Sequence, residues 1–206
     1  TMKEKVNYLN NNDITECDDN NDGEITINLN QTTDTEILGG QLSFNYTIKY
    51  YESQLKADTD TDALSMPYQN ISNPQTLFAR IENNENQACF DTTSLLLTVF
   101  DTPTVNAVTN NEICDDSIDG DGTNGQKTTN LQIFDTDVLG SQDPLKFRVS
   151  YYKSQTDADT KTNPHPNLYY NLTPITEQIF VRIETILNEN CFDTTSFNLI
   201  VNPLPI

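Results

Sequence analysis

Residues 89–94 read Cys-Phe-Asp-Thr-Thr-Ser, and the same six residues return at positions 191–196. After each copy, apolar side chains occupy every second position: Leu95, Leu97 and Val99 in the first copy, Phe197, Leu199 and Val201 in the second. Alternation with a period of two is typical of a strand with one buried face. The stretch therefore predicts a strand that closes each of two related units.

Further blocks recur in the same order and at nearly one spacing. Cys17-Asp18-Asp19-Asn20-Asn21-Asp22-Gly23 returns as Cys114-Asp115-Asp116-Ser117-Ile118-Asp119-Gly120, Tyr50-Tyr51-Glu52-Ser53-Gln54 as Tyr151-Tyr152-Lys153-Ser154-Gln155, and Arg80-Ile81-Glu82 as Arg182-Ile183-Glu184. An ordered repeat of this length indicates a duplicated domain. We predict two domains, residues 1–102 and 103–206, each ending where Pro103 or Pro203 stops a sheet ladder.

The period of two extends through each unit, for example over Phe44, Tyr46 and Ile48. Short alternating runs separated by Asn, Asp, Gly and Pro indicate antiparallel strands. About seven strands in about 100 residues predict an all-β fold of two tandem immunoglobulin-like antiparallel β-sandwich domains. One helical turn is expected after Ser53 and one after Ser154, because serine caps helix N-termini. We expect no longer helix.

The charge of the chain restricts its partners. The 31 acidic against 11 basic side chains give a formal net charge of −20. Phosphates would repel such a surface, so we expect no nucleic-acid partner. No apolar run approaches the roughly 20 residues that span a bilayer, so we expect no membrane insertion.

No pattern of residues indicates an enzyme. The single histidine, His165, lies between two prolines and is interpreted as a loop residue. Arg80 and Arg182 hold equivalent strand positions, where a structural ion pair or stacking on tyrosine is the main interpretation and anion binding the alternative. The segment Asp58–Asp62 is interpreted as a solvated loop, because Lys161 interrupts its counterpart.

The four cysteines allow three pairings. Each repeat holds one cysteine before its Asp-rich loop and one at the start of its last strand. We therefore predict one disulfide within each domain, Cys17–Cys89 and Cys114–Cys191, in an oxidising compartment. Buried free thiols are the alternative, and a zinc site is disfavoured because no CxxC pair is present.

The Asp-rich loops resemble the first half of a calcium-binding loop. Oxygen ligands at alternate positions followed by glycine suit a calcium ion. The predicted disulfides would bring Asp91 and Asp193 beside these loops and complete two calcium sites. The predicted ligands are Asp18, Asn20, Asp22, Glu24 and Asp91 in the first site, and Asp115, Ser117, Asp119, Asp121 and Asp193 in the second. Solvated turns rich in Asn and Asp are the alternative.

The repeated blocks also resemble a known family. Cys-Asp-Asp-x-x-Asp-Gly, Tyr-Tyr-x-Ser-Gln-x-x-Ala-Asp (50–58 and 151–159), Tyr-x-Asn (68–70 and 169–171), Phe-x-Arg-Ile-Glu and Cys-Phe-Asp-Thr-Thr are similar to the tandem Ig-like repeats of large Bacteroidetes cell-surface proteins. The resemblance implies an extracellular, cell-surface module of the adhesin or gliding-motility type, exported by type IX secretion.

We therefore expect a non-catalytic repeat module that calcium and disulfides stabilise, with neighbouring repeats of the same polypeptide as its first partners. A cell-surface glycan or protein is the expected ligand. The alternative is a carbohydrate-binding module of a secreted surface protein or hydrolase, with Tyr68 and Tyr169 candidates for a sugar-binding surface.

Overall fold

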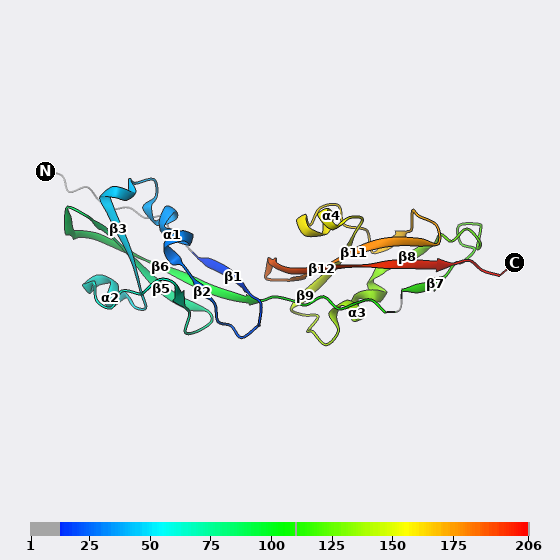
Figure 1. Cartoon of the computed structure of the whole chain (residues 1–206), viewed down its shortest axis with the longest axis horizontal. Helices are drawn as coiled ribbons and strands as arrows, with labels where there is room; N and C mark the ends of the chain where they lie inside the picture. Colours follow the sequence, from blue (N-terminus) through cyan, green and yellow to red (C-terminus); the bar gives the residue numbers. More distant parts are fainter. Residues whose placement is uncertain (1–12, 110, 206) are drawn as a thin grey trace. The chain divides into compact units, whose positions relative to one another are not determined.

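The computed structural model describes residues 13–109 and 111–205. The chain divides into two compact units, residues 1–101 and 102–206, which we call domain 1 and domain 2 (Figure 1). Each is described by itself.

Domain 1 is built on a four-stranded sheet with the strand order β1-β6-β5-β3, and the short strands β2 and β4 form a second sheet. Its strands and helices are β1 Ile14–Asp18, β2 Thr26–Ile27, α1 Leu29–Leu38, the 3-10 helix η1 Ser43–Asn45, β3 Tyr46–Tyr51, α2 Gln54–Thr59, β4 Tyr68–Gln69, β5 Gln75–Asn83 and β6 Asn86–Asp101.

Domain 2 repeats this architecture, with a sheet of order β7-β12-β11-β9 and a second sheet of β8 and β10. Its strands and helices are β7 Glu112–Cys114, β8 Thr128–Asn130, the 3-10 helix η2 Leu131–Phe134, α3 Asp135–Leu139, β9 Phe147–Tyr152, α4 Gln155–Thr160, β10 Leu168–Tyr170, β11 Thr176–Thr185 and β12 Asn188–Asn202. The predicted all-β, Ig-like class is confirmed, with six described strands in each domain.

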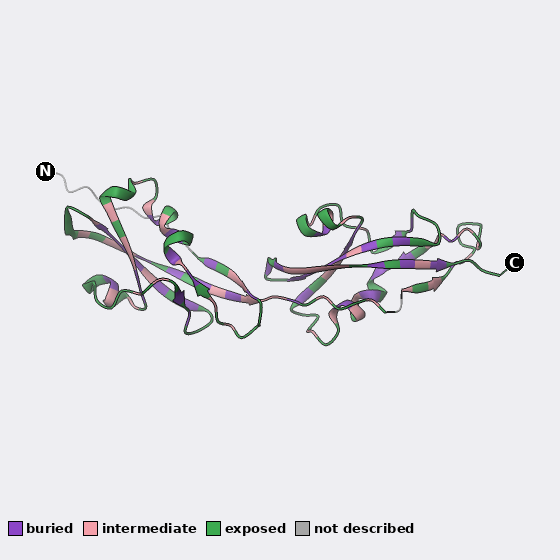
Figure 2. Ribbon diagram, in the orientation of Figure 1, coloured by how far each residue is buried: buried purple, intermediate pink, exposed green. Residues whose placement is uncertain are grey.

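The alternating apolar positions form the two cores. Leu95, Leu97 and Val99 on β6 are buried, and Leu96 between them is exposed. In the C-terminal half of β12, from Ser196 to Asn202, buried residues likewise alternate with exposed or intermediate ones (Figure 2). Successive side chains of a strand point to opposite faces of the sheet, so one face of each strand fills the core.

The expectation that no helix exceeds one turn is wrong in both domains, because η2 and α3 follow each other without a gap from Leu131 to Leu139 in domain 2 and α1 of domain 1 is longer still. Helix α1 has ten residues and ends at Gly39, whose φ of 57° is left-handed. Leu29, Thr33 and Ile37 are its buried residues, spaced by four. Such spacing places side chains on one face of a helix. Threonine in this stripe hides the apolar pattern, and Leu29 instead continues the alternation of Ile25 and Ile27.

The predicted short helices after Ser53 and Ser154 are confirmed as α2 and α4. The Ser53 hydroxyl accepts a hydrogen bond from the backbone N–H of Lys56, and the Ser154 hydroxyl accepts one from Asp157. These bonds satisfy one of the free N–H groups at each helix start.

In each domain, the first strand pairs in parallel with the last strand. Residues Ile14–Asp18 of β1 lie beside Leu97–Asp101 of β6. In domain 2, Glu112–Cys114 of β7 lie beside Ile200–Asn202 of β12. Both ends of each domain are therefore fixed in one sheet, with β12 between β7 and β11.

The segment before β7 packs onto domain 2. Val105 and Val108 pack against its apolar core. The backbone N–H of Asn106 donates to the carbonyl of Val138, and that of Thr109 donates to the Asp137 carboxylate. Residues 104–109 therefore belong to the folded part of domain 2.

Candidate functional site

The two cysteines of a domain lie at opposite ends of its longest strand. In domain 1, Cys17 on β1 lies beside Phe100, near the C-terminal end of β6. Cys89 lies near the start of β6, eleven residues from Phe100. Eleven strand residues span about 35 Å, whereas disulfide-bonded residues have Cα atoms within about 7 Å. A bond between these two cysteines is therefore excluded by the strand itself.

Domain 2 has the same arrangement. Cys114 lies beside Asn202, at the C-terminal end of β12, and Cys191 lies eleven residues before that position. The structure thus separates the cysteines into two classes, one at the end of the first strand (Cys17 and Cys114) and one near the start of the last strand (Cys89 and Cys191).

One cysteine of each class is disulfide-bonded. Cys17 and Cys191 are bonded, whereas Cys89 and Cys114 are free. The predicted pairs Cys17–Cys89 and Cys114–Cys191 are therefore wrong. The repeat correctly suggested two equivalent classes of cysteine, but it could not reveal that a full strand length separates them within each domain.

The first Asp-rich loop closes on its own backbone. Asp18 is buried, and its two carboxylate oxygens accept hydrogen bonds from the N–H groups of Asn20 (3.0 Å) and Gly23 (2.6 Å). Asp22 accepts from the N–H of Glu24 at 2.8 Å. Asp and Asn side chains commonly stabilise turns in this way. The loop therefore has the form of the alternative interpretation, a series of Asx turns.

The second loop is longer but has the same anchor. Asp115 is buried and accepts from the N–H groups of Asp116 (2.7 Å) and Gly125 (2.9 Å). Gly125 thus holds the structural place of Gly23, and both have left-handed φ angles, 71° and 81°. The sequence match of Gly23 with Gly120 is therefore displaced, and the extra residues of domain 2 lie inside the loop.

An asparagine from the neighbouring strand segment completes each loop. The Asn70 side chain accepts from the N–H of Ile25 and donates to the carbonyls of Gly23 and Ser72. Asn171 accepts from Lys127 and donates to Gly125 and Thr173. The Tyr-x-Asn motif contains both residues, but its repetition alone did not reveal this role.

The remaining predicted calcium ligands do not converge. Asp91 lies opposite Ile81, ten residues along β6 from Asp101, the strand partner of Asp18. Ten strand residues span about 33 Å. Asp193 lies opposite Ile183 and accepts a hydrogen bond from the N–H of Val105. The expected approach of Asp91 and Asp193 to the loops is therefore wrong, because it depended on disulfides that are not formed.

Among the described residues, no group of three or more His, Cys, Asp or Glu side chains is arranged to hold a metal ion. The other predicted ligands lie on the loops themselves. Asn20, Asp22, Glu24, Ser117, Asp119 and Asp121 are exposed. The hydrogen bond from Asn124 is the main cause that lowers the pKa of Asp119, followed by the backbone N–H of Asp121 and the Tyr170 hydroxyl at 3.0 Å.

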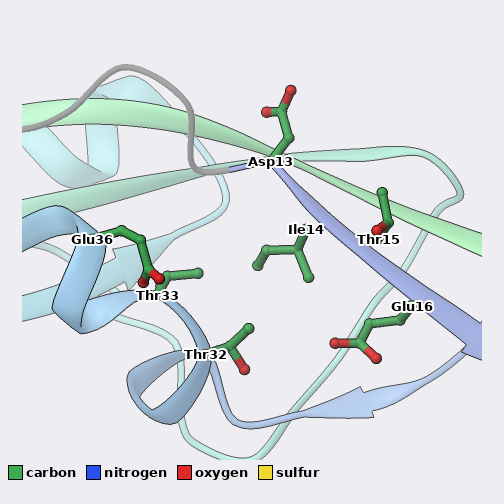
Figure 3. Close-up of a pocket in the computed structure, with 7 residues that line it drawn as sticks. All are labelled: Asp13, Ile14, Thr15, Glu16, Thr32, Thr33 and Glu36. Carbon is green, nitrogen blue, oxygen red and sulfur yellow. The ribbon is translucent and has the colours of Figure 1, made fainter. Parts of the chain in front are cut away.

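A groove of about 250 Å³ lies between β1 and α1 of domain 1 (Figure 3). In Figure 3, Ile14 points from β1 toward the helix, and the Asp13 carboxylate points away. The lining residues are Asp13, Ile14, Thr15, Glu16, Thr32, Thr33 and Glu36. This set contains no nucleophilic cysteine, histidine or cation, so it provides no catalytic pair of the Ser-His or Cys-His type.

The predicted structural role of the two arginines is confirmed. The Nε of Arg80 donates to Glu82 at 2.9 Å, and that of Arg182 donates to Glu184 at 2.8 Å. Both arginines and both glutamates are buried. Each guanidinium also stacks on a ring, but the rings belong to Phe90 and Phe192 rather than to a tyrosine.

The tyrosines considered for sugar binding point into the protein. Tyr68 and Tyr169 are buried. Their hydroxyls bond to Gln75 at 2.8 Å and to Glu177 at 2.9 Å. Neither ring therefore presents an open face to a ligand. His165 lies against Tyr169 with ring centroids 4.0 Å apart, and burial lowers the pKa of its imidazole.

No helix in the described part of the chain is long and apolar enough to cross a membrane. A disulfide persists in an oxidising environment rather than in the cytosol. The bonded state of Cys17 and Cys191 therefore indicates a non-cytoplasmic protein.

Several solved structures of tandem domains resemble the chain. Sidekick-1 immunoglobulin domains 1–4 match 91% of this chain and 46% of that chain, with 9% identity and a TM-score of 0.32. The titin I-band fragment I67–I69 matches 92% and 62%, with 10% identity and a TM-score of 0.34. Zebrafish RET cadherin-like domains 1–4 match 94% and 47%, with 18% identity and a TM-score of 0.22. The chain thus spans about half of the first of these proteins.

No curated protein matches the chain. One family model, described as the Flavobacterium inter-domain disulphide bond domain, matches it twice, over residues 13–103 and 110–205. The two matches contain all four cysteines, two in each. The chain therefore belongs to the Flavobacterium inter-domain disulphide bond domain family and carries two of its repeats.

Proposed function

We propose that this chain is two links of a non-enzymatic extracellular array in which disulfides join consecutive domains. One observation carries the proposal: each domain holds its two cysteines at opposite ends of a long strand, and one cysteine of each class is bonded. Since Cys89 and Cys114 are free, Cys17 and Cys191 pair with each other. The family description supports a bond of this kind.

The free cysteines extend the same rule beyond this chain. Cys114 belongs to the class of Cys17, which bonds to the following domain. Cys89 belongs to the class of Cys191, which bonds to the preceding domain. We infer that Cys114 pairs with the next repeat of the polypeptide and Cys89 with the previous one. Each pair of thiols gives two electrons and two protons to an oxidant of the extracellular environment.

The array serves as the stalk of a cell-surface adhesin. The high negative charge keeps repeats soluble and apart from each other's surfaces. The assignment to adhesins or gliding-motility proteins exported by type IX secretion rests on the similarity of the repeats, and a glycan or protein at the cell surface is the proposed ligand of the parent protein. The burial of Tyr68 and Tyr169 makes the carbohydrate-binding module the weaker candidate.

Peptide mapping without reductant tests the pairing. We expect one cross-linked species that contains Cys17 and Cys191, together with alkylation of Cys89 and Cys114. The Cys89→Ser/Cys114→Ser variant should keep the cross-link. Recovery of a Cys17–Cys89 or Cys114–Cys191 peptide from natively folded protein contradicts the proposal.

Oxidation of the purified fragment tests the array. A mild oxidant should join Cys114 of one molecule to Cys89 of another and produce a ladder of head-to-tail oligomers that reductant dissolves. Cys89→Ser should stop the ladder at dimers, formed through two Cys114 thiols, and the double variant should stay monomeric. A ladder that persists in the double variant contradicts this assignment.

A further inference from the structure

The bonded cysteines lie where a cross-link shortens the covalent path most. Cys17 is the fourth residue of β1, the first described strand, and Cys191 is the fourth residue of β12, the last strand. A bond between them encloses residues 18–190 in a loop. The shortest covalent path through both domains then runs along residues 13–17, the disulfide and residues 191–202.

We propose that this path makes the chain a tension-bearing tether of fixed length. Load applied at the two ends passes along β1, the Cys17–Cys191 bond and β12, and it leaves the rest of both domains outside the loaded path. This function rests on the proposed pairing of Cys17 with Cys191, but it adds a mechanical consequence that the pairing alone does not test.

The two strand segments of the loaded path have almost no slack. A β-strand rises about 3.3 Å per residue, and a fully stretched chain reaches at most about 3.6 Å per residue. Residues 14–17 of β1 and 191–202 of β12 are already in strands. The path of residues 13–17 and 191–202 measures about 60 Å when fully stretched. Pulling can therefore lengthen each of the two strand segments by only a few ångströms.

The loop that the disulfide closes contains most of the length that the chain could gain on unfolding. Residues 18–190 would contribute about 600 Å if they could be drawn out. Without the bond, unfolding of each domain would release roughly 250–300 Å beyond its folded length. The disulfide prevents this extension. Residues 18–190 lie inside the loop that the bond closes, so the pulling force passes through the bond and bypasses them.

Both strands of the loaded path are also paired with neighbouring strands of their sheets. Five residue pairs join β1 to β6 in parallel register. Strand β12 lies between β7 and β11, with ten residue pairs to β11. The neighbouring strands lie outside the loaded path, so their hydrogen bonds support β1 and β12 without carrying the load between the two ends. The strands therefore stay anchored while they transmit load.

Single-molecule stretching of the whole chain, held at its two ends, tests the inference. The Cys89→Ser/Cys114→Ser variant keeps the bonded pair and prevents links between molecules. We expect it to show no step of roughly 250–300 Å before the tether breaks, and two such steps after addition of reductant. The matched Cys17→Ser/Cys191→Ser variant should show both steps without reductant.

Peptide mapping of the same sample separates two kinds of failure. Absence of the Cys17–Cys191 peptide defeats the proposed function, and the tether with it. Presence of that peptide together with two long steps in the absence of reductant overturns the tether alone. Presence of the peptide with no long step supports both.

Discussion

The guanidinium carbon of Arg182 lies 3.5 Å from the centre of the Phe192 ring, and Arg80 repeats the contact over Phe90 at 3.4 Å. Both arginines extend beyond the ring to the backbone. Arg182 donates to the carbonyls of Ala158 and Asp159 at the end of α4, and to that of Glu189 in β12. Each arginine therefore joins a short helix to the edge of its hairpin while neutralising a buried glutamate.

Removal of Arg182 should strongly destabilise domain 2. Arg182→Ala removes one of the three cations that contact the buried Glu184 carboxylate, while Arg148 and Lys161 remain. It also leaves the carbonyls of Ala158, Asp159 and Glu189 without this donor, and a lost buried hydrogen-bond partner costs about 1–3 kcal/mol. Urea unfolding measures the effect. Arg182→Lys is the control, since it keeps the charge but loses the planar group, and we expect an intermediate loss. Equal stability of Arg182→Ala and the native chain contradicts the structural role.

The two domains carry opposite charges at one equivalent position, Asp60 and Lys161. This difference predicts that a second substitution can restore stability that a first one removes. In domain 1, Lys49 bonds to Asp60 (2.8 Å) and Glu82 (2.9 Å). In domain 2, Ser150 and Lys161 hold the places of Lys49 and Asp60, and Lys161 itself reaches Glu184 at 2.7 Å. Asp60→Lys alone sets two cations together and should lower the free energy of unfolding by about 1 kcal/mol or more. Adding Lys49→Ser should restore most of it.

Thermal melting of the single and double variants measures this rescue, with Lys49→Ser alone as the control. The single variant Lys49→Ser should itself be destabilised, because Glu82 loses a cation while Arg80 remains. If the stability losses of the two single variants add in the double variant, then Lys161 of domain 2 is not the functional equivalent of Lys49 in domain 1.

Domain 2 should lose stability in mild acid through His165. Burial lowers the pKa of His165 in the folded state below its ordinary 6.5, against the opposing charge of Glu177, with smaller effects from Lys153 and Asp157. The unfolded chain therefore binds the proton first. The contribution of this residue is full above pH 6.5 and declines as the pH falls toward the folded pKa.

The first repeat supplies the control substitution. Leu64 makes the same backbone bond to Tyr50 that His165 makes to Tyr151. His165→Leu should reduce the fall in the urea midpoint between pH 7.5 and pH 5 on the order expected for one group. An identical pH dependence in the variant would mean that His165 protonates equally in both states.

The asparagines of the Tyr-x-Asn motif should be indispensable to the loops. Asn70→Ala removes three hydrogen bonds and leaves the Gly23 carbonyl without this donor. A lost buried partner costs about 1–3 kcal/mol. We expect a comparable loss for Asn171→Ala, measured by chemical unfolding. Asn45→Ala is the matched surface control, because Asn45 is exposed, and it should change stability little.

Calcium stays a prediction for the exposed loop carboxylates. We expect millimolar calcium, the range typical of extracellular modules, to raise the melting temperature relative to a chelator. Asp22→Ala should remove this increase. Asp18→Ala should lower the melting temperature in chelator as well, because Asp18 accepts two backbone N–H groups. Equal melting of the native chain with calcium and with chelator would end the prediction.

The strands could be predicted because their pattern is local. Leu77, Ala79 and Ile81 alternate along β5, and all three are buried. Helix α1 could not be predicted in the same way, since its buried stripe includes Thr33 and its first apolar residue continues a strand pattern. The cysteine pairing failed for a different reason: it depends on the distance along β6, and a repeated pattern fits bonds within a domain as well as bonds between domains.

The packing of Val105 and Val108 on domain 2 has a consequence for how repeats can be exchanged. The family signature of this repeat begins at residue 110, after both valines. A gene rearrangement that cut at the signature would remove two half-buried valines from domain 2, and each would contribute less than the roughly 1.5–3 kcal/mol of a fully buried apolar side chain. A transferred copy of domain 2 therefore keeps its full core only when residues 104–109 move together with the signature.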